Sequence, residues 1–411
     1  MNLRCGFLHR NYGFPKPLTF KPKTNYRKSN FSLCAYHPNS KPNEKLLVVV
    51  GGGAAGIYGA IWAKTVAPNL NVKVSGGGRC NVTTGLCPDN SIMAEHYPRG
   101  HKELKGSFFS MHGPLDTMSW FTDRGVKLKT ESDGRVFPVS NSSSSIIDCL
   151  MNEARRKGVS VQSGKTVSTA SSSAAGKFVL KIKMRTSADL LEADYLLIST
   201  GSSKQGYSLA GQLGHSIIDP VPSLFTFKIN DSDLTELSGV LSFPPSMYFI
   251  FNHCSAVGPM LVTHWGLSGP VILRLSAWSA RDLYSSSYKG TLILDFVPDL
   301  HIEEVKSILL NQKKNFAKQK VENSSPSEFS LVKRFWKYLL KREGLAEDIS
   351  WASISKDQLF SIASLLKQCL FEVTGKGQFK DEFVTAGGVP LSEVASPLPF
   401  VPLFYFPLSI S

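Results

Sequence analysis

Residues 46–56 read LLVVVGGGAAG, and this stretch predicts the core of the fold. The first five residues form a continuous apolar run, which is typical of a strand that is buried on both faces. A glycine-rich loop follows directly, and residues 57–67 then have a helical pattern that Pro68 ends. A strand, a glycine loop and a helix in this order predict the opening of a parallel strand–helix–strand unit.

The loop has the pattern Gly51-x-Gly53-x-x-Gly56. The first glycine permits a tight turn, the second lets the backbone approach a pyrophosphate, and the third allows close packing of helix and strand. The start of the helix, which includes Ala55, offers N–H groups and a partial positive charge to phosphates. A coincidental glycine turn is the alternative, but the flanking strand and helix are the required context. We therefore predict that Gly51, Gly53, Ala55 and Gly56 bind a dinucleotide.

The rest of the dinucleotide fingerprint departs from the usual pattern. An acid about 20 residues after the loop normally binds the ribose hydroxyls. The second strand is predicted at residues 70–74, where no acid occurs, and the nearest acid downstream is Asp89. Lys73 would suit the 2′-phosphate of NADP. The interpretation that we prefer is that a piece of chain is missing at this point.

A second glycine loop, SGGGRCNVT, covers residues 75–83. Three successive glycines expose backbone amides, which suits close approach to a phosphate or a flat ring. Arg79 adds charge and Asn81 a directional hydrogen bond, whereas a flexible hinge is the alternative. For Cys80, a small buried residue is favoured over a redox thiol. The residues expected to contact the cofactor here are Gly76, Gly77, Gly78, Arg79, Cys80 and Asn81.

The basic N-terminal segment is predicted to be a transit peptide. Residues 1–43 contain eight Lys or Arg and no acid, and they lack the apolar core of a secretory signal. Residues 32–35, SLCA, resemble a plastid processing site with cleavage before Ala35. We predict a chloroplast location. Mitochondrial import and a disordered basic extension are the alternatives, but no Arg-rich amphipathic helix is evident.

Composition and charge exclude several classes of protein. The net charge is +14 at pH 7, of which the N-terminal segment supplies eight, and no basic stripe interleaved with aromatic residues follows, so we expect no nucleic-acid partner. Lys313-Lys314 and Lys333-Arg334 are interpreted as a solvated helix face.

The seven cysteines form no C-x-x-C pair and no Cys/His cluster, so we predict neither a metal site nor a redox dithiol. No apolar run reaches the roughly 20 residues of a membrane-spanning helix, and the apolar tail 394–411 contains four prolines.

Several blocks resemble the flavoproteins of the bacterial YhiN-like group, which are also described as HI0933-like or aminoacetone-oxidase-like NAD(P)/FAD-dependent oxidoreductases. The combination of SGGGRCN with the later blocks THWGLSGP and VTAGGV is specific to this group, whereas the first glycine loop alone is not. The matching blocks are VVVGGGAAG (48–56), SGGGRCNVT (75–83), GRVFP (134–138), Thr200-Gly201, THWGLSGP (263–270) and VTAGGVPL (384–391).

The resemblance implies an α/β fold, in which a Rossmann-like FAD domain of the glutathione-reductase type contains inserted β-barrel and helical subdomains. It implies bound FAD, with both glycine loops and Thr200-Gly201 against it, and hydride or electron transfer to a small-molecule substrate that the sequence does not identify. Some members are similar to reductases of conjugated ketones. NAD(P)H is considered as a transient donor, although no second G-x-G-x-x-G motif occurs. His264 would suit proton transfer near neutral pH, but orientation of the turn beside Trp265 is the favoured role.

The resemblance and the residue patterns divide the chain into five expected segments. These are a transit peptide (1–44), an incomplete FAD-binding Rossmann-like domain (45–220), a β-rich insert (221–300), a helical insert (301–370), and a return to the FAD domain with an atypical tail (371–411).

Two departures from the family pattern support an alternative. Members have further residues, including the ribose-binding Glu, between the second strand and the SGGG loop, whereas here Val74 is followed directly by Ser75. Members also continue into a glycine-rich C-terminal block, whereas here Glu393 leads into the proline-rich tail. The alternative is a truncated, non-catalytic isoform with weak or no FAD binding. A flavin-dependent enzyme that modifies nucleic acid is a third interpretation, which the modest charge of the mature chain disfavours. The sequence assigns no catalytic residue and no oligomeric state.

Overall fold

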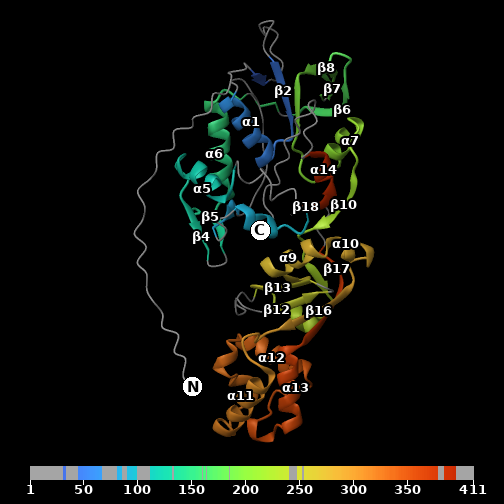
Figure 1. Cartoon of the computed structure of the whole chain (residues 1–411). Coiled ribbons are helices and arrows are strands. Elements are labelled where there is room, and N and C mark those ends of the chain that lie inside the picture. Colours follow the sequence, from blue (N-terminus) through green and yellow to red (C-terminus); the bar gives the residue numbers. More distant parts are fainter. Residues whose placement is uncertain are drawn as a thin grey trace, which may run out of the picture.

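The computed structural model describes residues 31–33, 45–66, 81–85, 90–99, 112–131, 134–159, 161–162, 164–184, 186–239, 248–251, 254–377 and 384–394. The predicted second strand at 70–74, the residues Gly76 to Cys80, the cleavage site before Ala35 and the tail beyond residue 394 lie outside this set. From top to bottom in Figure 1, a Rossmann unit, a sheet unit and a helical unit follow one another along the molecule.

The Rossmann unit contains a parallel sheet in the order β1-β2-β9. Its strands are β1 (Phe31–Leu33), β2 (Lys45–Val50) and β9 (Tyr195–Ile198). Strand β1 falls within the predicted transit segment. Strand β2 is covered on both faces, as its apolar sequence predicts. Val48 and Val50 pack against one hydrophobic cluster, and Leu47 and Val49 pack against another.

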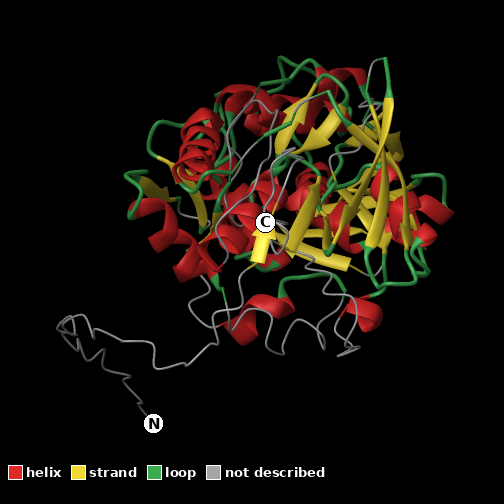
Figure 2. Ribbon diagram, turned by 90° about the horizontal axis from the view of Figure 1, so that it is seen from above, coloured by secondary structure: helices red, strands yellow, loops and turns green. Residues whose placement is uncertain are grey.

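The two faces of β2 are covered by different elements. Helices α1 (Ala54–Val66) and α6 (Ser143–Arg156) cover one face. The other face packs against an antiparallel sheet and one helix, which are β6 (Thr166–Ser172), β7 (Phe178–Lys183), β8 (Ala188–Ala193) and α7 (Lys204–Gln212). The view from above shows a group of helices on the left and strands in the centre and on the right (Figure 2).

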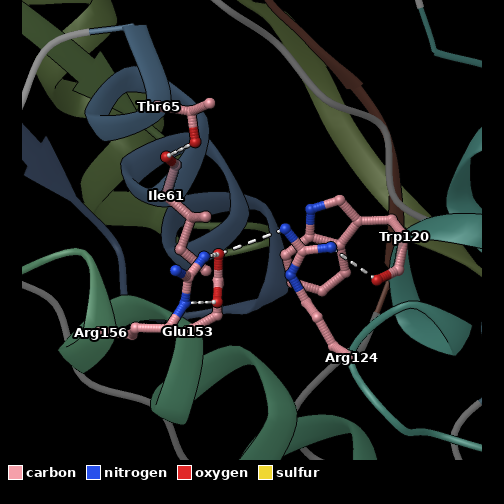
Figure 3. Close-up of polar contacts among 6 residues, drawn as sticks. All are labelled: Ile61, Thr65, Trp120, Arg124, Glu153 and Arg156. Carbon is pink, nitrogen blue, oxygen red and sulfur yellow. Dashed lines mark hydrogen bonds and ion pairs between the residues drawn. The ribbon is translucent and has the colours of Figure 1, made fainter.

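A buried carboxylate joins α6 to the segment after α5 (Pro114–Thr122). Glu153 Oε1 accepts from Arg124 Nη2 at 3.2 Å and from Arg156 Nη2 at 2.7 Å (Figure 3). The Arg124 guanidinium also lies 4.0 Å from the centre of the Trp120 ring. Beside this junction, a small antiparallel sheet is formed by β3 (Thr83–Thr84), β5 (Arg135–Pro138) and β4 (Leu128–Thr130).

The sheet unit is a seven-stranded antiparallel sheet in the order β13-β12-β16-β17-β11-β15-β14. Its strands are β11 (Phe227–Ile229), β12 (Tyr248–Phe251), β13 (Cys254–Val257), β14 (Leu261–Thr263), β15 (Gly266–Ser268), β16 (Gly290–Asp295) and β17 (Cys369–Lys376). Its helices are α8 (Ser232–Thr235), α9 (Pro270–Trp278) and α10 (Ala280–Ser285).

The helical unit is inserted between the neighbouring strands β16 and β17. Its helices are α11 (Ile302–Asn315), α12 (Lys333–Arg342) and α13 (Lys356–Lys367). Capping boxes begin two of them, with His301 and Glu304 at α11 and Ser355 and Gln358 at α13. One hydrophobic cluster extends from Phe227 and Leu292 in the sheet to Trp336 and Trp351 between the helices. The sheet and helical units therefore share one core.

The basic pairs predicted to form a solvated face have mixed surroundings. Lys314 and Arg334 are exposed. However, Lys313 donates to the carbonyl of Ile354, and Arg334 Nη2 donates to the carbonyl of Glu236 at 3.1 Å. One residue of each pair therefore also fixes a neighbouring segment.

An antiparallel pair of strands connects the Rossmann unit with the sheet unit. The chain leaves the Rossmann unit through β10 (Ile218–Ser223) and returns through β18 (Val384–Gly388), and Figure 1 shows both strands between the two units. Helix α14 (Leu391–Val394) follows β18, and Leu391 packs against Ala94 and Tyr97 in and after α2 (Asn90–Glu95).

The predicted fold class is confirmed: the chain has a Rossmann-type α/β domain with inserted β and helical parts. Among the described helices, none combines the length and the hydropathy that crossing a bilayer requires.

Candidate cofactor site

The candidate site lies where the parallel strands β2 and β9 end side by side. Ser199, the residue after β9, donates its N–H to the carbonyl of Val50 at 2.8 Å, and its Oγ donates to the same oxygen at 3.2 Å. The first glycine loop begins at this point with Gly51. The carboxyl edge of parallel strands is where open α/β sheets bind their ligands.

Gly51 has a backbone conformation and a close neighbour that only glycine accommodates. Its φ is +119°, in the region that other residues rarely adopt. A Cβ at this position would lie 2.2 Å from the carbonyl oxygen of Ser199. The loop is therefore pressed directly onto the end of β9.

Gly53 and Gly56 have opposite surroundings. A Cβ at Gly56 would lie 2.0 Å from the carbonyl oxygen of Gly51 and 2.6 Å from Ser199 Oγ, so the helix is packed tightly against the loop. A Cβ at Gly53 would meet no atom of the described residues within 4 Å. Gly53 directly precedes α1, and its carbonyl accepts from the N–H of Ile57 at 3.0 Å. The open space therefore lies at a helix N-terminus, where N–H groups and the helix dipole favour an anion.

Thr200 and Gly201 complete the edge beside this loop. A Cβ at Gly206 would lie 1.9 Å from Thr200 Oγ1, so α7 is packed closely against Thr200. The carbonyl of Thr200 accepts from the N–H of Ser203, the residue that caps α7. Gly201 has a φ of +58°, with no described atom within 4 Å of a Cβ. Helices α1 and α7 therefore both begin at the carboxyl edge of the sheet.

Of the second glycine loop, only its end belongs to the described residues. Asn81 Oδ1 accepts from the N–H of Val136 at 3.1 Å, and the N–H of Val82 donates to the carbonyl of Val136 at 2.8 Å. Asn81 thus anchors the loop to the GRVFP strand β5. Cofactor contacts from Gly76, Gly77, Gly78, Arg79, Cys80 and Asn81 stay a prediction.

His264 lies at the tip of the β14–β15 hairpin. Its Nδ1 is 2.9 Å from Ser238 Oγ, and the neighbouring Trp265 is 48% exposed. Thr263 Oγ1 donates to the carbonyl of Gly266 across the turn at 3.1 Å. This geometry agrees with the turn-orienting role favoured for His264.

The VTAGGV motif, to which the sequence assigned no site residue, lies against α7. Gly388 has a φ of +105°, and a Cβ there would lie 3.1 Å from Cε1 of Tyr207. The Tyr207 hydroxyl is 2.5 Å from Thr385 Oγ1. Tyr207 follows Gly206, which touches Thr200, so the motif is connected with the glycine-loop edge through two adjacent residues of α7. The paired glycines 387–388 were the signal for this contact, but nothing in the sequence pointed to Tyr207.

A second group that sequence reasoning missed lies beside the fifth residue of α1. The Tyr58 hydroxyl is 3.3 Å from His112 Nδ1, and Thr117 Oγ1 is 3.0 Å from His112 Nε2. Burial raises the pKa of Tyr58 to about 12 and lowers the pKa of His112. Both side chains are therefore neutral at physiological pH, and the group acts as a hydrogen-bonded link between α1 and α5.

Two of the described cysteines are poor redox groups. Cys149 and Cys369 are buried, and burial raises the pKa of both thiols, to about 12 for Cys369. A raised thiol pKa suppresses the reactive thiolate. Within the described ranges, no group of three or more His, Cys, Asp or Glu side chains forms a metal site.

Comparison with known proteins places these features in a wider context. A family model described as "HI0933-like protein Rossmann domain" matches residues 45–398. The 3-dehydro-bile acid delta(4,6)-reductase of Clostridium scindens is 25% identical over 372 residues, which cover 84% of this chain and 87% of the reductase. The ribosomal RNA dihydrouridine synthase of Haemophilus influenzae is 25% identical over 380 residues, or 85% of this chain and 87% of the synthase.

The solved structures that resemble the chain are much more distant. The anhydrotetracycline hydroxylase OxyS of Streptomyces rimosus is 13% identical, with a TM-score of 0.29, over 50% of this chain and 42% of the hydroxylase. The family match, by contrast, spans the Rossmann unit and both inserted units, and it gives no support to a truncated, non-catalytic isoform.

Proposed function

The chain belongs to the HI0933-like family of Rossmann-domain proteins, and from this premise we propose that it is an FAD-dependent reductase that adds hydrogen to a conjugated carbon–carbon double bond. The observation that carries the proposal is the glycine loop between β2 and α1. Gly51 packs directly on Ser199, whereas no described atom lies within 4 Å of a Cβ placed on Gly53 at the N-terminus of α1. A pyrophosphate needs this kind of cradle.

The residues of the edge fit a dinucleotide in distinct ways. The N–H groups at the start of α1, including that of Ala55, would bind the pyrophosphate, since the first N–H groups of a helix have no partner within the helix. Gly56 holds the helix close to the strand, and Thr200-Gly201 borders the loop on the β9 side. Bound FAD would supply two-electron hydride chemistry. The protein would orient the substrate and exclude water.

The names of the two relatives support the substrate class. One relative is named for reducing delta(4,6) bonds of a 3-dehydro bile acid, and the other for making dihydrouridine in ribosomal RNA. Both names describe the addition of hydrogen to an unsaturated ring that carries a carbonyl group. We propose the same chemistry for this chain, with a small conjugated carbonyl compound as substrate and NAD(P)H as the transient donor.

The proposed location is the chloroplast. The support is the acid-free, basic segment of residues 1–43 and the SLCA sequence at 32–35, in which cleavage before Ala35 is proposed.

The test is a half-reaction with the full chain after loading with FAD, because a start at Ala35 would remove strand β1 from the sheet. The flavin is reduced with NADPH without oxygen, the excess is removed, and acceptors are added. We expect a conjugated enone to restore the flavin absorbance within seconds to minutes, and the saturated ketone with the same skeleton to leave it bleached. Reoxidation by oxygen alone, with no response to any conjugated acceptor, would contradict the proposal.

The same assay distinguishes the proposed reaction from a second candidate, the reduction of a base in RNA. This candidate is favoured by two relatives that are named ribosomal RNA dihydrouridine synthase. Reoxidation by a ribosomal RNA transcript, with dihydrouridine in the product and no response to enones, would replace the small-molecule substrate by RNA.

A further inference from the structure

The strand pair between the Rossmann and sheet units has an irregular register at its centre. Val221 pairs with Ala386, and Ile218 pairs with Gly388, so the register shifts between these two pairs. Asp219 and Pro220 lie in the shifted part of β10, and Pro220 has no N–H to donate. Such a bulge leaves backbone groups outside the regular ladder.

One side chain of the sheet unit bonds to both strands at the bulge. Arg281, in α10, donates from Nη2 to the carbonyl of Asp219 at 3.0 Å and to the carbonyl of Ala386 at 3.2 Å. Asp219 belongs to the strand that leaves the Rossmann unit, and Ala386 to the strand that returns. The guanidinium thus holds both connections at once, through charge-assisted hydrogen bonds.

Gly387 and Gly388, which follow Ala386, also pack closely at the bulge and on α7. Gly387 has a φ of +134°, and a Cβ there would lie 2.8 Å from the carbonyl oxygens of Ile218 and Asp219. Gly388 packs on Tyr207, and the adjacent Gly206 packs on Thr200 at the glycine-loop edge. A continuous series of contacts therefore leads from the candidate cofactor site to Arg281.

A second arginine makes a weaker connection between the same units. Arg99, which follows α2 in the Rossmann unit, donates from Nη2 to the carbonyl of Trp278 at the end of α9, at 3.4 Å. Because α10 begins two residues after Trp278, this bond acts on the helix pair that carries Arg281.

We propose that Arg281 is a positioning residue that fixes the orientation of the sheet unit relative to the cofactor edge, and thereby sets the space in which a substrate meets the flavin. This proposal rests on the proposed function for its catalytic consequence. Its structural part, that Arg281 holds the β10–β18 pair, does not require a bound cofactor.

The test compares Arg281→Ala and Arg281→Lys with Arg274→Ala, a control at an exposed position of the adjacent helix α9. In the chain without FAD, hydrogen exchange measured by mass spectrometry follows the amides of 218–223 and 384–388. We expect Arg281→Ala to accelerate their exchange about tenfold or more, since it removes charge-assisted bonds, and to leave β16 and β17 unchanged. Arg274→Ala should match the wild type.

With FAD bound, Arg281→Ala should retain the FAD affinity and the rate of reduction by dithionite. Its reoxidation by the enone should be about tenfold slower, which corresponds to 1.4 kcal/mol. Arg281→Lys, which keeps a charged donor, should recover part of that rate. If the amides of 218–223 and 384–388 exchange in Arg281→Ala as they do in the wild type, the structural part of the proposal is overturned. Faster exchange with wild-type reoxidation would overturn the positioning role. If the wild type binds no FAD, the proposed function fails and the exchange result still stands.

Discussion

At residue scale, three glycines at the junction of β2 and α1 have three different physical tasks. Gly51 needs its positive φ, Gly56 needs its missing side chain for packing, and Gly53 needs neither. A Cβ at Gly53 would meet no described atom, so no contact among the described residues requires glycine there. This agrees with the proposal that a ligand approaches the backbone at Gly53.

This difference leads to a prediction for Gly53→Ala. The substitution should leave the unfolding temperature equal to or slightly above that of the wild type, because alanine restricts the unfolded chain more than glycine does. FAD binding should weaken by about 10- to 100-fold. The added methyl group would keep the pyrophosphate away from the backbone N–H groups, and loss of one charge-assisted hydrogen bond costs about 1.5–3 kcal/mol. Titration of the apoprotein with FAD, followed by flavin fluorescence, measures the affinity.

The matched control is Gly211→Ala, in helix α7, where a Cβ would make only an ordinary contact with Ile217 at 3.9 Å. It should bind FAD like the wild type. An equal affinity of Gly53→Ala and Gly211→Ala for FAD would show that the space at Gly53 is not the pyrophosphate site.

The residues that could be predicted from sequence are those whose role depends on neighbours in the chain. The glycine loop is such a case, because strand, loop and helix are consecutive. Tyr207 and Arg281 could not be predicted, since their partners Thr385, Asp219 and Ala386 lie 62 to 178 positions away. The position of His264 in a turn follows from its neighbours, which form a short hairpin, while its role stays a prediction.

At the scale of elements, α5 and α6 are joined by one buried carboxylate (Figure 3). A hydrogen bond from Arg156 is the main cause that lowers the pKa of Glu153, and Arg124 adds to it against the opposing effect of burial. A lowered pKa means that the charged form stabilises the fold at neutral pH. This contribution is lost as the pH falls below the ordinary glutamate value of 4.5 and through the folded-state pKa.

The corresponding prediction is that Glu153→Gln lowers the free energy of unfolding at pH 7 by about 1.5–3 kcal/mol, the usual loss for hydrogen bonds to a charged group. The difference from the wild type should shrink on acidification below pH 4.5, because the unfolded wild-type chain then binds a proton at Glu153 that the folded chain binds only at a lower pH. Urea unfolding followed by circular dichroism at both pH values gives the two differences.

The control is Glu303→Gln at the exposed ion pair with Lys306, which should leave the free energy of unfolding nearly unchanged. A difference between Glu153→Gln and the wild type that stays constant from pH 7 to below pH 4.5 would contradict the electrostatic account.

The elements themselves were predictable to different degrees. The apolar run of β2 and the helix after the glycine loop follow from local pattern. The seven-stranded sheet does not, since its order places β11 beside β17, with about 140 residues between them. The resemblance to a known family supplied the inserted units that periodicity alone left as separate β-rich and helical stretches.

At the scale of the whole molecule, the Rossmann unit and the inserted units are connected by two adjacent strands, β10 and β18 (Figure 1). The sheet and helical units share one hydrophobic core and thus form one body. When two bodies are connected through one strand pair, the bonds at that pair fix their relative orientation. Arg281 and the glycines of VTAGGV lie where such control is expected.

The measurement that tests the central claim most directly is the visible spectrum of the full chain, incubated with FAD and then desalted. We predict flavin bands near about 370 and 450 nm that stay with the protein at about one FAD per chain. A folded protein that is colourless after desalting would contradict the claim that the loop between β2 and α1 holds a flavin dinucleotide.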